Sequence, residues 1–262
     1  MSYKAIEFSL SNNVARITLN RPEAANTVNM ALAKDLAKVS IECSENPEIR
    51  AVLLNANGKM FCAGGDLATF AGAKERVPTL IKELTLYFHA AVSRFHRMQA
   101  PMITAVHGFA AGGGPSLCAV GDYSIATETS KFTMAYTAAG LCPDGSSTYT
   151  LPKLIGLRRT KELMLLNPVL SSQEAKDWGL INEVVEDDAL LQRAEQIAKD
   201  WAKGPTAAYG AVKRLLINSA NEGLEAQMEH EAQEVAKLSG GLDGQEGINA
   251  FLEKRKPNFV GS

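Results

Sequence analysis

Two glycine-rich turns, each directly after a short apolar run, limit the possible folds of this chain more than any other feature. The turn at residues 61–67 follows the run 51–55, and the turn at 108–115 follows the run 102–106. Short apolar runs bounded by turn residues are typical of buried strands. Glycine has no Cβ, so a ligand can approach main-chain N–H groups at these strand ends. The pattern therefore predicts an α/β fold with backbone donors exposed where two strands end.

Such donors can have a catalytic purpose. Two N–H groups that converge on one carbonyl oxygen form an oxyanion hole, which stabilises the charge of an enolate or a tetrahedral adduct. Taken alone, each turn is equally consistent with glycines that only relieve backbone strain.

Composition narrows the class of protein. The 262 residues, 46% of them hydrophobic, suffice for one α/β domain with a C-terminal helical extension. A net charge of -2 leaves no basic excess for a nucleic-acid partner. Four cysteines without CxxC spacing indicate a reducing compartment. No apolar run approaches the roughly 18 residues of a membrane span, so we expect a cytoplasmic protein that binds neither membrane nor metal.

Apolar periodicity predicts alternating strands and helices up to about residue 170, which implies a parallel sheet between helices. The expected strands are 5–9 and 14–19 as a hairpin, 50–55, 102–106, 123–127 and 131–134. The expected helices in this part are 30–44, 79–98, 147–154 and 158–166, with a mobile stretch at 71–78 and a loop at 140–147. From residue 171 the pattern is almost wholly helical, with segments that begin at 172 and cover 188–203, 205–220 and 224–238.

Asp144 is the first candidate for chemistry, because it lies in a turn-rich loop just before an expected helix. An aspartate in this place is often an N-cap or turn residue. The functional alternative is a general acid or base, since a carboxylate among Phe, Leu and Cys side chains would be desolvated and able to pass a proton.

Three histidines and one tyrosine remain open in the same way. His89 and His96 lie seven residues apart on one face of the helix 79–98, without the additional ligands that a metal site needs. Each is either a packed histidine or a base or donor in a pocket. His107 either lies near the chemistry or holds its turn together. Tyr136 either packs with its hydroxyl satisfied or faces the same pocket as Asp144. The pair Arg158-Arg159 either begins a solvated helix or contacts phosphates or a partner subunit.

Taken together and in this order, these motifs resemble the crotonase (enoyl-CoA hydratase/isomerase) superfamily nearly from end to end. The residues that carry the resemblance are Asn20-Arg21-Pro22, Phe61-Cys62-Ala63-Gly64-Gly65-Asp66-Leu67, His107-Gly108-Phe109-Ala110-Ala111-Gly112-Gly113-Gly114, Gly140-Leu141-Cys142-Pro143-Asp144 and Ala175-Lys176-Asp177-Trp178-Gly179-Leu180-Ile181.

The resemblance implies a fold, an assembly and a ligand. The fold would be a spiral of ββα units over residues 1–200, with a helical trimerisation region over 201–262 and a homotrimer or a dimer of trimers. The ligand would be an acyl-CoA whose thioester carbonyl binds the amides of Gly65 and Gly113. The CoA adenine would lie along Ala63, Gly64, Asp66 and Leu67, with Gly112, Ser116 and Tyr136 lining the acyl pocket. CoA would be the handle of the substrate, and no cofactor would be needed.

The catalytic positions discriminate within the family. Hydratases of this type carry two glutamates, at positions that match Ser116 and Tyr136, and neither residue can act as a carboxylate base. Asp144 stands where some enoyl-CoA isomerases and a ring-epoxide isomerase branch keep one acid. The resemblance therefore favours an isomerase in which Asp144 moves a proton from Cα to Cγ of the acyl chain.

Two alternatives stay open. Aromatic acyl-CoA dehalogenases use a nucleophilic aspartate at the position of Asp144 and a histidine at that of His89, but a tryptophan where this chain has Tyr136. A hydrolytic reaction of this kind would make Asp144 the nucleophile and His89 the base. The second alternative is a member of the fold that binds acyl-CoA without catalysis.

Overall fold

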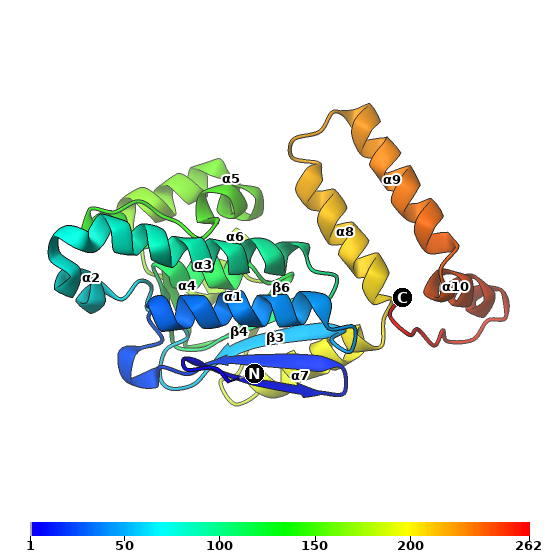
Figure 1. The fold of residues 1–262 in the computed structure, drawn as a ribbon, viewed down its shortest axis with the longest axis horizontal. Helices are drawn as coiled ribbons and strands as arrows, with labels where there is room; N and C mark the ends of the chain where they lie inside the picture. The colour runs from blue at the N-terminus through cyan, green and yellow to red at the C-terminus, as the bar shows by residue number, and fades with distance from the viewer. Residues whose placement is uncertain (1) are drawn as a thin grey trace.

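The computed structural model describes residues 2–262, and a six-stranded sheet lies at its centre (Figure 1). In spatial order the strands are β1 (Ile6–Ser11), β2 (Val14–Leu19), β3 (Ala51–Ala56), β4 (Met102–Val106), β6 (Tyr123–Thr127) and β9 (Glu183–Val185). The first two form an antiparallel hairpin and the remaining pairs are parallel. The expected hairpin and parallel sheet are therefore confirmed.

Helices cover both faces of this sheet, as its continuous apolar strands require. On one face, α7 (Leu190–Ala202) packs small side chains such as Ala198 against strand residues such as Leu53 and Ile103. On the other face lie α1 (Met30–Glu45) and α3 (Val77–Arg97), above the sheet in Figure 1 while α7 lies below it.

A second, three-stranded sheet carries the elements around the glycine turns. It consists of β5 (Phe109–Ala111), β7 (Lys131–Thr133) and β8 (Leu170–Ser171), with β5 and β7 parallel. The helices that contact it are α4 (Gly113–Ala119) and α6 (Ser172–Trp178), and α5 (Ser147–Leu166) packs against α4. The helix α2 (Leu67–Ala73) contacts α3 instead, and the 3-10 turns are η1 (Pro22–Ala24), η2 (Lys74–Arg76) and η3 (Thr137–Ala139).

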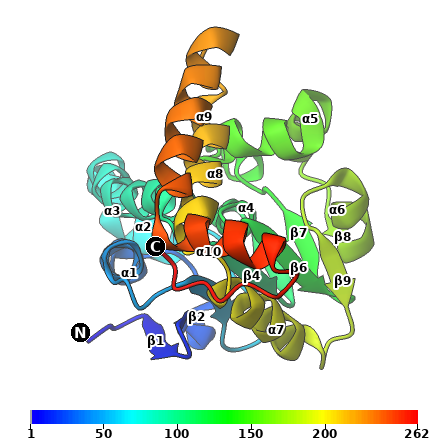
Figure 2. The same cartoon turned by 90° about the vertical axis from the view of Figure 1, so that its right-hand side faces the viewer.

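The last three helices project from this core as an arm, drawn from yellow to red in Figures 1 and 2. They are α8 (Thr206–Asn218), α9 (Leu224–Ser239) and α10 (Leu242–Leu252). The end of the chain folds back onto α10, where the buried Asp243 carboxylate accepts hydrogen bonds from the amides of Val260, Gly261 and Ser262. The division of the chain at residue 200 stays a prediction.

Several expected elements differ in the structure, each for a physical reason. The stretch 71–78, expected to be mobile, is helical, with a break at Lys74, whose φ is 49°. By contrast, the two helices expected at 147–154 and 158–166 are confirmed: they follow each other within α5 and are separated at Gly156, whose φ of 77° and ψ of 154° are not helical. The strands β8 and β9 and the helix α10 were not predicted. Strands of two or three residues have no readable period, and the glycines of α10 hide its helical pattern.

Candidate active site

The two glycine turns lie side by side, because β5 and the residue Cys62 bond to each other through their backbones. The Cys62 amide donates to the Phe109 carbonyl at 3.2 Å, and the Ala111 amide donates to the Cys62 carbonyl at 2.9 Å. The turns approach so closely that a Cβ on Gly64 would lie 3.1 Å from Gly112 Cα. Glycine is therefore required at this crossing, and Gly64 also has a φ of 93°.

The amides of Gly65 and Gly113 lie at this crossing, and among the described residues neither has a hydrogen-bond acceptor. The neighbouring Gly64 carbonyl and Asp66 amide bond to the backbone of Val28, at 2.7 and 3.2 Å, which holds the first turn. Within residues 2–262 no group accepts a hydrogen bond from the Gly65 amide. Gly113 begins α4, so its amide has no acceptor inside the helix. Two unpaired donors on packed turns can bind one oxygen atom of a ligand.

Gly64→Ala tests whether the catalytic rate depends on this crossing. An alanine Cβ would lie 3.0 Å from the Ala111 carbonyl oxygen and 3.3 Å from the Gly113 amide nitrogen, so the turns must separate. With the acyl-CoA substrate that the resemblance implies, we expect kcat to fall by about 100-fold, since a displacement of about 1 Å can cost that much. Steady-state kinetics will measure it.

Gly156→Ala is the matched control for this variant. Gly156 also has a positive φ, 77°, but nothing lies within 4 Å of an added Cβ. Gly156→Ala therefore places an alanine at a positive φ, as Gly64→Ala does, but it does not push the two glycine turns apart. Equal losses of kcat in the two variants would contradict the role given to the crossing.

Asp144 lies in the loop between η3 and α5 and is held there by its backbone. Its carbonyl oxygen accepts hydrogen bonds from Ser116 Oγ at 3.1 Å and from Ser147 Oγ at 2.8 Å. Gly145 and Ser146 follow with φ values of 59° and 68°. The loop thus turns sharply and leaves the Asp144 side chain 30% exposed, partly desolvated but open to a ligand.

Tyr136 donates a short hydrogen bond of 2.5 Å from its hydroxyl to Asp144 Oδ1. Burial, and then the charge of Asp144, raise the pKa of Tyr136, so its hydroxyl stays a donor across the physiological range. The same hydroxyl would lie 3.6 Å from a Cβ placed on Gly113. Tyr136 therefore connects the carboxylate to the second glycine turn.

His89 approaches the other carboxylate oxygen, from α3. Its Nε2 lies 3.5 Å from Asp144 Oδ2 and accepts a hydrogen bond from the Gly145 amide at 3.2 Å. An Nε2 that accepts this bond carries no proton, so the neutral ring holds its proton on Nδ1. His89 is half exposed and belongs to the same site as Asp144.

The other two histidines lie outside this group. His96 Nε2 is 3.5 Å from Ser146 Oγ, and burial, followed by the charge of Lys213, lowers the pKa of His96 to about 4. It is a neutral, packed histidine behind the loop. His107 Nε2 bonds to the Gly58 carbonyl at 2.9 Å, so His107 connects the start of the second turn to the loop before the first.

The remaining predicted residues lie around the two turns with different orientations. The Asp66 carboxylate is occupied, because it caps α2 at the Thr69 amide and pairs with Arg21 at 3.1 Å. Burial acts to raise the pKa of Asp66, but the bonds from Thr69 and Arg21 outweigh it and lower that pKa. Leu67 is exposed, whereas Ser116 is buried with its hydroxyl on the Asp144 backbone. Ala63 and Gly112 are pinned by backbone bonds to Ala25 and Thr133.

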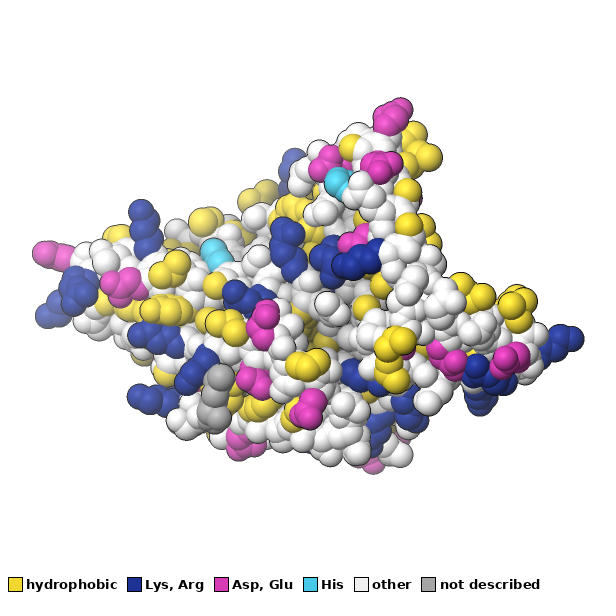
Figure 3. Space-filling view, turned by 45° about the vertical axis from the view of Figure 1, so that its right-hand side comes forward, with side chains coloured by type: hydrophobic (Ala, Val, Ile, Leu, Met, Phe, Trp, Pro, Cys, Tyr) yellow, Lys and Arg dark blue, Asp and Glu magenta, His cyan; other side chains and the backbone are white. Residues whose placement is uncertain are grey.

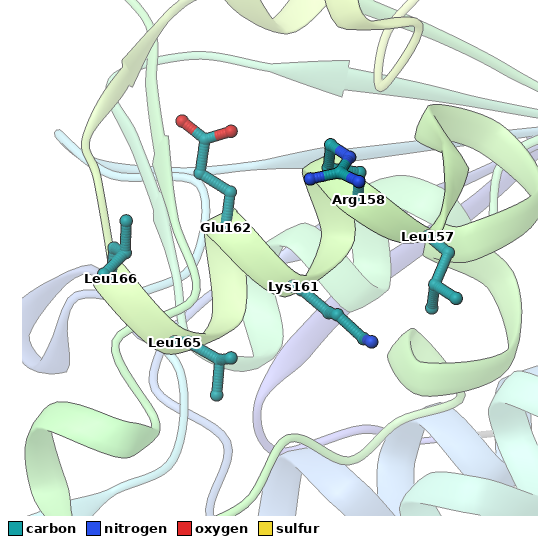
Figure 4. A pocket seen from close by; sticks show the side chains of 6 residues that line it. All are labelled: Leu157, Arg158, Lys161, Glu162, Leu165 and Leu166. Carbon is teal, nitrogen blue, oxygen red and sulfur yellow. The ribbon is translucent and has the colours of Figure 1, made fainter.

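A groove of about 710 Å³ lies elsewhere, along the outer surface of α5 (Figure 4). Its lining is Leu157, Arg158, Lys161, Glu162, Leu165 and Leu166. Arg159, by contrast, donates to the Asp177 carbonyl and lies over the Trp178 ring. Residues 2–262 contain neither a cluster of three or more metal-ligating side chains nor a helix long and apolar enough to span a membrane.

The sequence analysis identified the residues with reactive side chains, but it did not identify the residues that hold those side chains in place. Thr27 and Arg21 hold Asp66, and Phe88 lies under Gly145, where an added Cβ would be 2.7 Å from its ring. The adjacent residues Asp144-Gly145 were a readable turn pattern. The contact of Phe88 with that turn joins residues far apart in the chain and has no local pattern.

Comparison with known proteins shows the family and the fold of the chain. The family model for enoyl-CoA hydratase/isomerase matches residues 9–262. The chain is 36% identical, over 98% of its length and 99% of the relative, to the 1,2-epoxyphenylacetyl-CoA isomerase of Escherichia coli. It is 29% identical to a 4-chlorobenzoyl coenzyme A dehalogenase of an Arthrobacter species, covering 93% of this chain and 89% of that one. A crystal structure of an enoyl-CoA hydratase from Bacillus anthracis superposes with a TM-score of 0.92 at 31% identity, covering 99% and 100% of the two chains. The chain therefore belongs to the enoyl-CoA hydratase/isomerase family, and its fold is the crotonase fold.

Proposed function

We propose that this protein is a CoA-thioester isomerase that shifts a carbon–carbon double bond, with Asp144 as its general acid and base. The observation that carries the proposal is one partly exposed carboxylate beside two unpaired amides, those of Gly65 and Gly113. Ser116 and Tyr136 supply no second carboxylate, which favours proton transfer over the addition of water.

In the proposed reaction the thioester oxygen binds the amides of Gly65 and Gly113. Asp144 removes a proton from Cα, and the electron pair moves into the carbonyl, where the amides stabilise the dienolate. The protonated Asp144 then returns the proton at Cγ, which completes the shift of the double bond. CoA acts as the substrate's handle along Ala63 to Leu67, and the steps require no further cofactor.

A second candidate is hydrolysis or dehalogenation with Asp144 as nucleophile. The observation that favours it is the distance of 3.5 Å between His89 Nε2 and Asp144 Oδ2, because an unprotonated nitrogen there can activate water. The hydrogen bond from Tyr136 opposes it, since a carboxylate that accepts a 2.5 Å bond is a weaker nucleophile.

Two measurements distinguish the two reactions: the identity of the product and the incorporation of ¹⁸O from water into Asp144. A 3-enoyl-CoA should become the 2-enoyl isomer, and a single turnover in ¹⁸O-water should leave Asp144 unlabelled. If ¹⁸O appears in the peptide that contains Asp144 after a single turnover of an aromatic acyl-CoA, Asp144 acts as a nucleophile and the isomerase proposal is wrong. Binding of acyl-CoA without any turnover would leave only the binding function.

We further propose that the chain assembles as a homotrimer or a dimer of trimers. Support comes from large apolar side chains on the arm that stay exposed in the single chain, among them Leu216, Met228, Val235 and Phe251. Figure 3 shows such hydrophobic side chains along the projecting arm. Exposed apolar surface of this kind marks interfaces. Light scattering should give three or six times the chain mass of 28.1 kDa, and a mass of one chain would contradict the assembly.

A further inference from the structure

The two oxygens of the Asp144 carboxylate have different surroundings. Oδ1 accepts the 2.5 Å hydrogen bond from Tyr136. Oδ2 faces His89 Nε2 at 3.5 Å, but that nitrogen already accepts a hydrogen bond from the Gly145 amide. Neutral His89 therefore has no proton on this nitrogen to donate, and no other described residue bonds to Oδ2. One oxygen is held and the other is free.

Tyr136 is itself held firmly. Its amide donates to the Met134 carbonyl at 2.7 Å, and its carbonyl accepts from the amides of Ala139 and Leu141 at 3.0 and 2.9 Å. The preceding residue, Ala135, has a φ of 55°, a conformation that a non-glycine residue adopts only when its surroundings impose it. The hydroxyl of Tyr136 therefore has a fixed position relative to the carboxylate.

We propose that Tyr136 is the positioning residue that holds Asp144 Oδ1 and leaves Oδ2 as the only atom that exchanges a proton with the substrate. This inference rests on the proposed isomerase function and adds to it the atom that carries the proton. The C–H bond at Cα breaks, its electron pair moves toward the thioester oxygen, and the proton binds Oδ2. The O–H bond then breaks as a C–H bond forms at Cγ.

Holding one oxygen has a consequence for the origin of the returned proton. A carboxyl group that cannot rotate keeps the abstracted proton on Oδ2, on the substrate side, until Cγ receives it. A carboxyl group that turns about its Cβ–Cγ bond exposes the proton to solvent. With a substrate deuterated at Cα, the native enzyme should therefore transfer much of the deuterium from Cα to Cγ of the same molecule.

Tyr136→Phe removes the hydroxyl and keeps the ring. We expect kcat to fall about 10- to 100-fold, the worth of a hydrogen bond to a charged group, with KM within about two-fold of native. In ²H₂O, deuterium at Cγ of the product should rise.

Tyr123→Phe is the matched control, because Tyr123 also donates to a carboxylate, Glu183 Oε2 at 3.1 Å, but on the central sheet. It should leave kcat and the deuterium content of the product unchanged. If Tyr136→Phe lowers kcat while the deuterium content of the product stays native, Tyr136 only supports the structure and the inference is wrong.

A measurement without turnover separates this inference from the proposed function. The ¹³C signal of the Asp144 carboxyl, assigned by its loss in Asp144→Asn, is recorded in the ligand-free protein at one fixed neutral pH. Its chemical shift should differ between Tyr136→Phe and the native protein and be the same in Tyr123→Phe and the native protein, because Tyr136 donates to Asp144 whereas Tyr123 donates to Glu183. An unchanged chemical shift in Tyr136→Phe overturns the role of Tyr136 whatever reaction is catalysed. A changed chemical shift in a protein that does not isomerise enoyl-CoA overturns the function alone.

Discussion

Asp144→Asn is expected to lower kcat for double-bond isomerisation by about 10²- to 10⁴-fold, the usual contribution of a general acid or base. Asparagine has nearly the same shape, and the hydroxyls of Ser116 and Ser147 still bind the backbone carbonyl of residue 144. Tyr136 can still donate to the side-chain oxygen. The loop should therefore keep its position, and the loss should be chemical. Steady-state kinetics with a 3-enoyl-CoA, together with calorimetric binding of the product, will show kcat reduced while the affinity stays within about two-fold.

Asp187→Asn is the matched control for this experiment. Asp187 also accepts a hydrogen bond from a hydroxyl, Thr129 Oγ1 at 2.7 Å, but at the protein surface, in the segment that follows β9. It should isomerise at the native rate. If Asp144→Asn keeps more than about a tenth of the native kcat, Asp144 is not the acid and base of this reaction.

Local sequence patterns were sufficient to predict the parallel sheet and the glycine turns, because each depends on residues close in the chain. Asp144 was recognisable as a loop carboxylate for the same reason. The side chains that surround the Asp144 carboxylate could not be recognised from the sequence. His89 and His96 share one helix face, and only the packing of the loop against α3 places His89 at Asp144 and His96 behind Ser146.

The sequence also could not predict which hydrogen-bond partners the individual side chains have. The Ser116 hydroxyl binds the Asp144 backbone, and the Asp66 carboxylate pairs with Arg21, which is 45 residues away in the chain. That Ser116 lines the acyl pocket and that CoA lies along Asp66 stay predictions. Tyr136 could be either a packed ring or a pocket residue until its hydroxyl was placed on Asp144. Each of these outcomes depends on contacts between distant segments, for which one sequence has no periodic pattern.

One buried lysine takes part in the attachment of the C-terminal arm to the core. Lys213 of α8 is 8% exposed, and its Nζ lies 2.7 Å from Asp122 Oδ2. The same nitrogen donates to the carbonyls of Phe95 and Ala100, at 3.0 and 3.2 Å, so each of its three protons has an acceptor. Burial lowers the pKa of Lys213 and raises that of Asp122, and their mutual attraction opposes both shifts. The pair is costly to bury and more costly to break.

Lys213→Met is expected to reduce the free energy of unfolding by about 3 kcal/mol, the lower end of the range for a broken buried pair, because Asp122 keeps 27% exposure of its side chain. For a chain of this length that corresponds to a fall in Tm of about 6 to 12 °C at a fixed protein concentration. Calorimetry and urea denaturation will measure both quantities.

The charge left behind, rather than the lost lysine packing, should dominate this cost, and a double variant separates the two. Adding Asp122→Asn to Lys213→Met removes the unpaired carboxylate while the side-chain oxygen can still accept the Met102 amide, which donates to Asp122 at 2.8 Å. The double variant should regain more than half of the lost stability. Lys199→Met, which breaks the exposed pair with Glu195 on α7, should cost less than about 0.5 kcal/mol. A double variant as unstable as Lys213→Met alone would mean that lysine packing, not the charge of Asp122, ties α8 to the core.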